Sequence, residues 1–78
     1  MVQTLETVAQ SSEGVTKTQL MYKAFLSFEQ LKEYLSLLLS NNLLEYNLNS
    51  RTYKITEKGV KLIKVYNKMK EYIETLED

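Results

Sequence analysis

The chain contains 78 residues, of which 10 are lysine or arginine and 10 are aspartate or glutamate, and it has no cysteine and no histidine. These absences exclude disulfides, zinc sites built on thiolates or imidazoles, and catalysis of the serine–histidine type. A formal net charge of zero is weak support for a nucleic-acid partner, so the distribution of the charges along the chain matters more than their sum.

We do not expect the N-terminal segment to be a signal peptide. It lacks a basic start, and no stretch of the chain approaches the roughly 20 apolar residues of a membrane-spanning helix. We therefore expect one small cytoplasmic domain that does not associate with a membrane. A chain of this length buries only about 60% of its unfolded surface, so assembly into an oligomer is one source of additional stability.

A first helix is expected over residues 2–11, with Val2, Leu5, Val8 and Ala9 on one side, and Gly14 suits the turn that follows it. Three later segments carry the signature of a helix start. In each, a serine or threonine cap lies between one apolar residue and a second apolar residue four positions after the cap. The three caps are Thr16, Ser27 and Thr56.

The first two of these caps have a complete capping box, because Gln19 and Gln30 stand three residues after Thr16 and Ser27. The third has Gly59 in that position. These starts predict helices over about 17–24, 28–41 and 57–76. The third helix in chain order has a stripe that we expect to be buried, formed by Phe28, Leu31, Leu35 and Leu38.

Two short strands with a polar connection are expected between the last two helices. With residues 48–51 as the loop, Tyr46 faces Tyr53 and Leu44 faces Ile55 on the inner side. Glu45 then faces Lys54 on the outer side. Aromatic pairs and pairs of opposite charge are both favourable across strands, so both faces of the hairpin support this register.

The last helix has an apolar seam with spacings of 3, 4, 3 and 4 residues, formed by Leu62, Val65, Met69, Tyr72 and Leu76. Such a seam is typical of a coiled coil, and the distal turns extend beyond what the domain can cover. Lysines fill the first part of the helix and acidic residues its end. An antiparallel pair of these helices places Lys61 near Glu77 and Lys64 near Glu74 of the second copy, whereas a parallel pair stacks like charges.

The fold class expected from this order is mainly α with a small β-hairpin, in the sequence helix, helix, helix, strand, strand, long helix. The short turn at Phe25-Leu26 joins two capped helices, which is a helix-turn-helix geometry, and the hairpin after them is a wing. We expect residues 1–60 to form this domain and residues 61–78 to continue from it as a dimerisation helix.

The chain resembles small archaeal winged helix-turn-helix proteins over about residues 15–66. The motifs that carry the resemblance are Thr16-Lys17-Thr18, Met21-Tyr22, Leu26-Ser27, Tyr34-Leu35 and Thr56-Glu57-Lys58-Gly59. The resemblance implies binding to DNA and dimers, which in some members form through an antiparallel coiled coil of the last helix. The chain departs from the family pattern at Asn42, where a glycine is usual, and in a first helix without a basic start.

In a winged helix-turn-helix the second helix of the motif enters the major groove, and the wing and the preceding helix hold the DNA backbone. The candidate DNA-binding residues are Thr16, Lys17, Thr18, Ser27, Gln30, Lys32, Arg51 and Lys54. Each also has a structural interpretation, as a helix cap, a solvated helix face, a turn residue or a cross-strand partner. The carboxylates of Glu29 and Glu33 on the same helix face oppose phosphate.

The sequence therefore predicts a homodimeric DNA-binding protein, a transcriptional regulator that binds double-stranded DNA. The alternative is a winged-helix module that binds protein and not DNA, which the neutral charge and the two glutamates favour. We expect no enzymatic activity, no metal or cofactor and no small-molecule ligand, because the chain has no catalytic constellation, phosphate-binding loop or metal-binding set.

Overall fold

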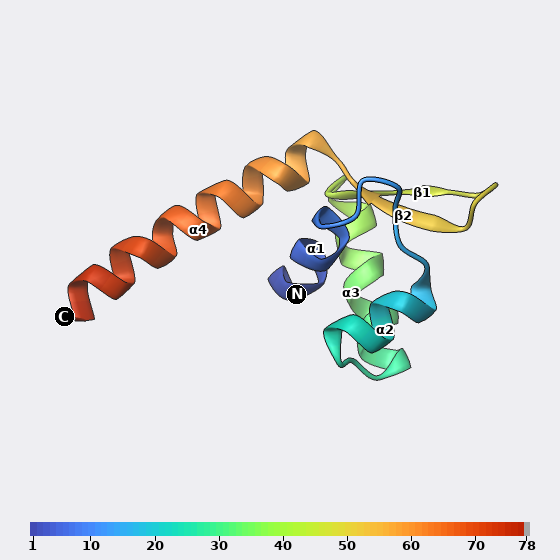
Figure 1. Ribbon diagram of the computed structural model, residues 1–78, viewed down its shortest axis with the longest axis horizontal. Helices are drawn as coiled ribbons and strands as arrows, with labels where there is room; N and C mark the ends of the chain where they lie inside the picture. The colour runs from blue at the N-terminus through green and yellow to red at the C-terminus, as the bar shows by residue number, and fades with distance from the viewer. Residues whose placement is uncertain (78) are drawn as a thin grey trace.

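The computed structural model describes residues 1–77, and the side chains up to Ile73. Its elements follow the expected order and confirm the expected fold class (Figure 1). They are α1 (Val2–Ala9), α2 (Lys17–Ala24), α3 (Phe28–Ser40), β1 (Leu44–Asn47), β2 (Thr52–Ile55) and α4 (Glu57–Glu77). Three helices and the hairpin pack together, and α4 extends away from them.

The starts of α2 and α3 are fixed by the two predicted capping boxes. The Thr16 hydroxyl accepts a hydrogen bond from the Gln19 backbone N–H at 3.2 Å, and the Gln19 side chain accepts one from the Thr16 N–H at 3.0 Å. Ser27 and Gln30 make the same reciprocal pair. Each box satisfies two backbone donors that a helix end otherwise leaves unpaired.

The turn between α2 and α3 depends on one residue in the left-handed region. Phe25 has a φ of 53°, and its side chain is 89% exposed. A bulky residue in this conformation is uncommon, because its Cβ crowds the backbone. The conformation turns the chain sharply enough for Leu26 to pack against the core just before Ser27 starts α3.

The core lies where α1, α2, α3 and the hairpin meet. Its buried residues are Leu5, Val8, Val15, Leu20, Leu31, Leu35, Leu38, Leu44 and Tyr53. The stripe predicted on α3 is correct for its three leucines and wrong for Phe28, which is 51% exposed. Phe28 is the first residue of α3, so it lies at the end of the bundle rather than between helices. The helix α1 ends at Ala9, two residues earlier than predicted, and Ala9 is exposed.

The hairpin has the predicted register, with Leu44 opposite Ile55, Glu45 opposite Lys54 and Tyr46 opposite Tyr53. The structure adds a pairing that the sequence analysis missed. Val15, just before α2, exchanges two backbone hydrogen bonds with Tyr53, with N–O distances of 3.0 and 2.7 Å. The base of the hairpin is therefore attached to the segment that leads into α2.

The start of α4 is joined tightly to the end of α3. The Thr56 hydroxyl caps α4 by accepting from the Gly59 N–H at 3.1 Å, and it donates to the Asn42 carbonyl at 2.7 Å. The Lys58 ammonium donates to the Asn41 carbonyl at 2.9 Å, which satisfies a carbonyl beyond the end of α3. These contacts set the direction in which α4 leaves the domain.

Only the first turns of α4 pack on the domain. Ile63 lies against the core, whereas Val60 is 36% exposed. Beyond Ile63, every described side chain of α4 is exposed, and the helix forms one arm of a molecule that measures 46 × 26 × 21 Å (Figure 1). Within residues 1–77, no helix has the length and apolar character needed to cross a membrane.

Candidate nucleic-acid interface

The pairing of Val15 with Tyr53 brings Lys17 and Arg51 to the same edge of the molecule. In an antiparallel pair, residues at equal distances on either side of a bridge lie opposite each other. Lys17 follows Val15 by two residues, and Arg51 precedes Tyr53 by two. The two cations thus come from segments distant in the sequence. Each lies two residues from the same hydrogen-bonded pair, Val15 and Tyr53.

A surface hollow of about 380 Å³ separates the start of α2 from the hairpin. Its lining residues are Thr16, Lys17, Thr18, Tyr46, Arg51 and Tyr53. The structure therefore gathers four of the eight predicted DNA-binding residues around one depression, together with two tyrosines that were not predicted as site residues. Both cations that line it are exposed to solvent.

The start of α2 supplies backbone donors to this hollow. Gln19 N–H is bonded to the Thr16 hydroxyl and Leu20 N–H to the Thr16 carbonyl. The N–H groups of Lys17 and Thr18, in the first turn of α2, have no acceptor within residues 1–77. Free N–H groups at a helix N-terminus and the positive end of the helix dipole both favour an anion.

The tip of the wing holds Arg51 through a small network of hydrogen bonds. The Asn47 side-chain oxygen accepts from the Asn49 N–H at 2.9 Å and from the Ser50 N–H at 3.3 Å. The Ser50 and Thr52 hydroxyls are 2.7 Å apart. Arg51 itself has a φ of 56°, so the loop ends in a left-handed residue that turns the chain into β2.

The two tyrosines form the wall of the hollow on the hairpin side. Their ring centroids are 4.8 Å apart and their planes are tilted by 49°. Tyr53 is buried, and this burial raises the pKa of its hydroxyl, with a smaller contribution from the nearby Tyr46. The raised pKa favours the neutral, hydrogen-bonding form of the Tyr53 phenol over an anion that would repel phosphate.

The outward face of α3 carries mixed charge. Lys32 lies beside Glu29, Glu33, Ser36 and Leu37 around a second shallow hollow. All five are exposed, so this face is available to a partner. A glutamate there accepts well from the amino group of cytosine but is unfavourable next to phosphate.

Ser27 and Gln30, unlike Lys32, make hydrogen bonds that cap α3. Both belong to the capping box of α3, in which the Gln30 side-chain oxygen accepts from the Ser27 N–H at 3.4 Å. Only the amino group of the Gln30 amide remains for another partner. These two predicted site residues therefore have a structural function in the free protein.

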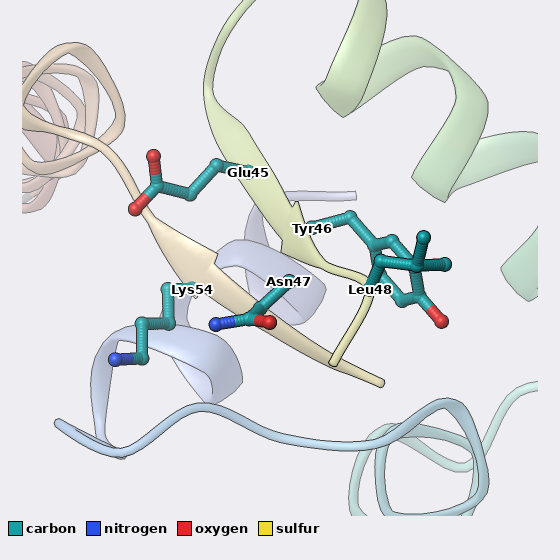
Figure 2. A pocket seen from close by; sticks show the side chains of 5 residues that line it. All are labelled: Glu45, Tyr46, Asn47, Leu48 and Lys54. Atoms are coloured by element: carbon teal, nitrogen blue, oxygen red, sulfur yellow. The ribbon is translucent and has the colours of Figure 1, made fainter. Parts of the chain in front are cut away.

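Lys54 lies on the opposite side of the hairpin from the tyrosine wall. Figure 2 shows Glu45, Asn47 and Lys54 on one side of the strands and Tyr46 and Leu48 on the other. The Lys54 stem packs over Gly14, where an added Cβ would lie 3.1 Å from Lys54 Cγ. Glu45 and Lys54 are cross-strand neighbours as predicted, but no ion pair joins them.

Of the residues predicted for a dimer seam, four are described, and all four are exposed. They are Leu62, Val65, Met69 and Tyr72, while the side chain of Leu76 is outside the described residues. Tyr66 and Ile73 are also exposed and lie next to this seam. Together they make an apolar face of three residues per seven, which is wider than the predicted seam of two.

A family model described as winged helix-turn-helix matches residues 1–76. No curated protein matches the chain at a significant level. The matched segment includes the hollow between α2 and the hairpin, the outward face of α3 and nearly all of α4.

Proposed function

The chain belongs to the winged helix-turn-helix family, and on that premise we propose that it binds duplex DNA as a homodimer and regulates transcription. The proposal places the protein in the cytoplasm, where its target DNA is accessible. The proposal includes no catalysis, cofactor, metal or small-molecule ligand. Residues 1–60 act as the DNA-binding domain and residues 61–78 as the dimerisation helix.

The observation that supports DNA binding best is the hollow between Lys17 and Arg51. Two cations, two threonine hydroxyls and two free backbone N–H groups meet there. This donor set matches the oxygens of a backbone phosphate, which proteins contact with basic side chains, hydroxyls and helix N-termini. Because α2 and the wing both border the hollow, a phosphate bound there fixes the position of α3 on the duplex.

With the backbone held at this point, α3 lies in the major groove. Lys32 is the basic residue on its outward face, and Glu29 and Glu33 are placed to accept from cytosine amino groups. The neutral charge of the whole chain is compatible with this arrangement, because two of the ten basic residues, Lys17 and Arg51, line the hollow and no acidic residue does. The electrostatic contribution to affinity is then small for a DNA-binding protein.

The dimer is proposed from the apolar face of α4. A second copy running antiparallel covers Leu62, Val65, Met69 and Tyr72, and sets the lysines of one helix beside the acidic end of the other. Each exposed pair is worth only ~0.2–1 kcal/mol, but symmetry doubles every pair and so selects the orientation. The two winged domains then lie at opposite ends of a rod, which suits two separated DNA sites.

A protein-binding module is the second candidate function. Its support is the outward face of α3, where Glu29, Glu33 and Leu37 make a surface that is acidic and partly apolar. Such a surface fits a basic partner protein. The two functions differ in their ligand, because only the first predicts binding to duplexes, which releases counterions and weakens as salt rises.

The test is a titration of random-sequence duplexes with purified protein at 50 and 200 mM salt. We expect binding that weakens at the higher salt concentration, and a further loss in Lys17→Ala. The matched control is Lys23→Ala, which removes the same charge from the other end of α2, where Lys23 lies beside α1. No binding at either salt concentration, or equal losses in the two variants, contradicts the proposal.

A further inference from the structure

Phe28 lies at the N-terminal end of α3, and its side chain is half exposed. The other apolar residues of its predicted stripe, Leu31, Leu35 and Leu38, are buried, whereas 51% of Phe28 is exposed. Single exposed apolar residues are common on protein surfaces and need no special explanation. The significance of Phe28 comes from its position, because the leading turn of this helix is the part that approaches base edges in a helix-turn-helix.

The Phe28 ring is also connected to the phosphate-facing hollow. The Lys17 ammonium lies 5.5 Å from the centroid of the ring, within the range of a cation–π interaction. Lys17 lines the hollow on the α2 side. The ring therefore lies between Lys17, which would hold the DNA backbone, and the outward face of α3, which would read the bases.

We propose that Phe28 is a base-reading residue that packs against the 5-methyl group of a thymine in the major groove. This inference depends on the proposed DNA binding. The thymine methyl is the apolar group on the major-groove edges of the base pairs, and a phenylalanine ring, which has no donor or acceptor of ordinary strength, can distinguish bases there through such a contact. Lys17, beside the ring, holds the adjoining phosphate, and the contact with the base is made by the ring itself.

The neighbours of Phe28 on α3 do not substitute for it in this function. Glu29 and Lys32 are charged, and Leu31 is fully buried. Insertion of the ring between base pairs is a different mechanism, which occurs from the minor groove and kinks the duplex. The leading turn of α3 faces the major groove in the proposed complex, so the ring meets base edges and not base faces.

The inference is tested on a duplex selected from random sequences by the purified protein. Each thymine is replaced singly by deoxyuridine, which removes the methyl group and keeps the base pair. We expect one thymine per bound domain at which this replacement weakens binding about three- to fivefold, the size expected for one buried methyl group. At that position, Phe28→Ala should bind the thymine and deoxyuridine duplexes equally.

Two further variants separate the ring from its neighbours. Phe28→Leu keeps an apolar side chain and should retain part of the thymine preference. Lys17→Ala should bind all duplexes more weakly and should keep the thymine preference. Circular dichroism of each variant checks that α3 is still formed.

The outcomes distinguish the inference from the function on which it depends. No binding to any duplex overturns both. Binding that is insensitive to every thymine methyl, or a thymine preference that is unchanged in Phe28→Ala, overturns the inference and leaves DNA binding in place. A preference lost equally in Lys17→Ala and Phe28→Ala overturns the assignment of the reading contact to the ring.

Discussion

Gly59 lies directly against the carbonyl oxygen of Leu43, so closely that a Cβ atom at Gly59 would overlap this oxygen. Such a Cβ would also lie 2.6 Å from Ile55 Cγ1. The first turn of α4 thus packs on the backbone of Leu43, just before β1, without any intervening side chain. This contact explains why a glycine interrupts the capping box of α4, where a longer box residue would separate the two segments.

We therefore expect Gly59→Ala to destabilise the protein by about 1–3 kcal/mol, as forced overpacking of a core does. This change in stability is opposite in sign to that at most helical glycines, where replacement by alanine stabilises the protein by up to about 1 kcal/mol. The measurement is urea unfolding followed by circular dichroism. Lys23→Ala, at an exposed position of α2 away from this contact and from the proposed dimer face, is the control and should change little. A Gly59→Ala variant as stable as the parent contradicts the close packing.

At the turn between α2 and α3, a glycine should instead stabilise the protein. Phe25 adopts a left-handed conformation at a cost of about 1–2 kcal/mol, and its exposed side chain recovers little of this by packing. Phe25→Gly relieves the strain, although part of the gain is lost to the greater freedom of glycine in the unfolded chain. We expect a net gain of about 0.5–1 kcal/mol by urea unfolding. Phe25→Ala, which keeps the strain, should show no gain, and a loss in Phe25→Gly would mean that the ring contributes to stability.

Removal of the Arg51 side chain should weaken DNA binding without loss of stability. Asparagine tolerates the left-handed conformation that Arg51 adopts, so Arg51→Asn preserves the turn. Loss of one phosphate contact lowers the slope of log affinity against log salt by about 1. Arg51→Lys keeps the charge and should keep the slope. An unchanged slope in Arg51→Asn removes the wing tip from the proposed interface.

The charges of α4 should control the strength of the dimer. Lys61→Glu with Lys64→Glu places acidic groups opposite the acidic end of the second copy, so we expect a weaker dimer. The measurement is the molar mass in solution as a function of protein concentration. The double variant Lys17→Glu with Lys23→Glu makes the same change in net charge away from α4 and is the control. A dimer of undiminished strength in the α4 variant contradicts the antiparallel arrangement.

Burial of Tyr53 predicts a dependence of stability on pH. Because the pKa of Tyr53 is raised in the folded state, folding favours the neutral phenol. The stability from this group is complete below the unfolded pKa of about 10 and is lost as pH rises through the higher folded pKa. Urea unfolding at pH 8 and at pH 10.5 should show a larger decline for the parent than for Tyr53→Phe. Equal declines would show that Tyr53 is as accessible as an ordinary tyrosine.

The features predicted correctly from the sequence are those encoded within a few residues. A cap and its box partner are three positions apart, and the hairpin register follows from the alternation of side chains on both sides of one short loop. Both signals are local, so the starts of α2 and α3 and the pairing of Tyr46 with Tyr53 were confirmed. The long exposed α4 followed from its length alone.

The features that were missed depend on contacts between distant segments. Periodicity placed Phe28 on the buried stripe, but it cannot show that neighbouring helices do not extend past the first residue of α3. Val15 is the apolar residue before the Thr16 cap, and the sequence indicates for it only a hydrophobic contact at the start of α2. Nothing close to Val15 in the sequence indicates that it pairs with Tyr53. Lys17 and Arg51 lie close together because of that pairing, so the sequence alone predicts both as candidate site residues but does not predict their proximity.

In the proposed complex with DNA, the double hydrogen bond between Val15 and Tyr53 also affects how the domain responds to the shape of a duplex. Each of the two backbone-facing cations is two residues from this bond, so their separation resists change when the rest of the wing bends. In the proposed complex, Lys17 and Arg51 contact the DNA backbone at two points whose separation is nearly constant. A duplex with a narrowed or widened groove must itself deform to fit, and the energy of that deformation becomes a means of choosing among sequences that the protein does not touch.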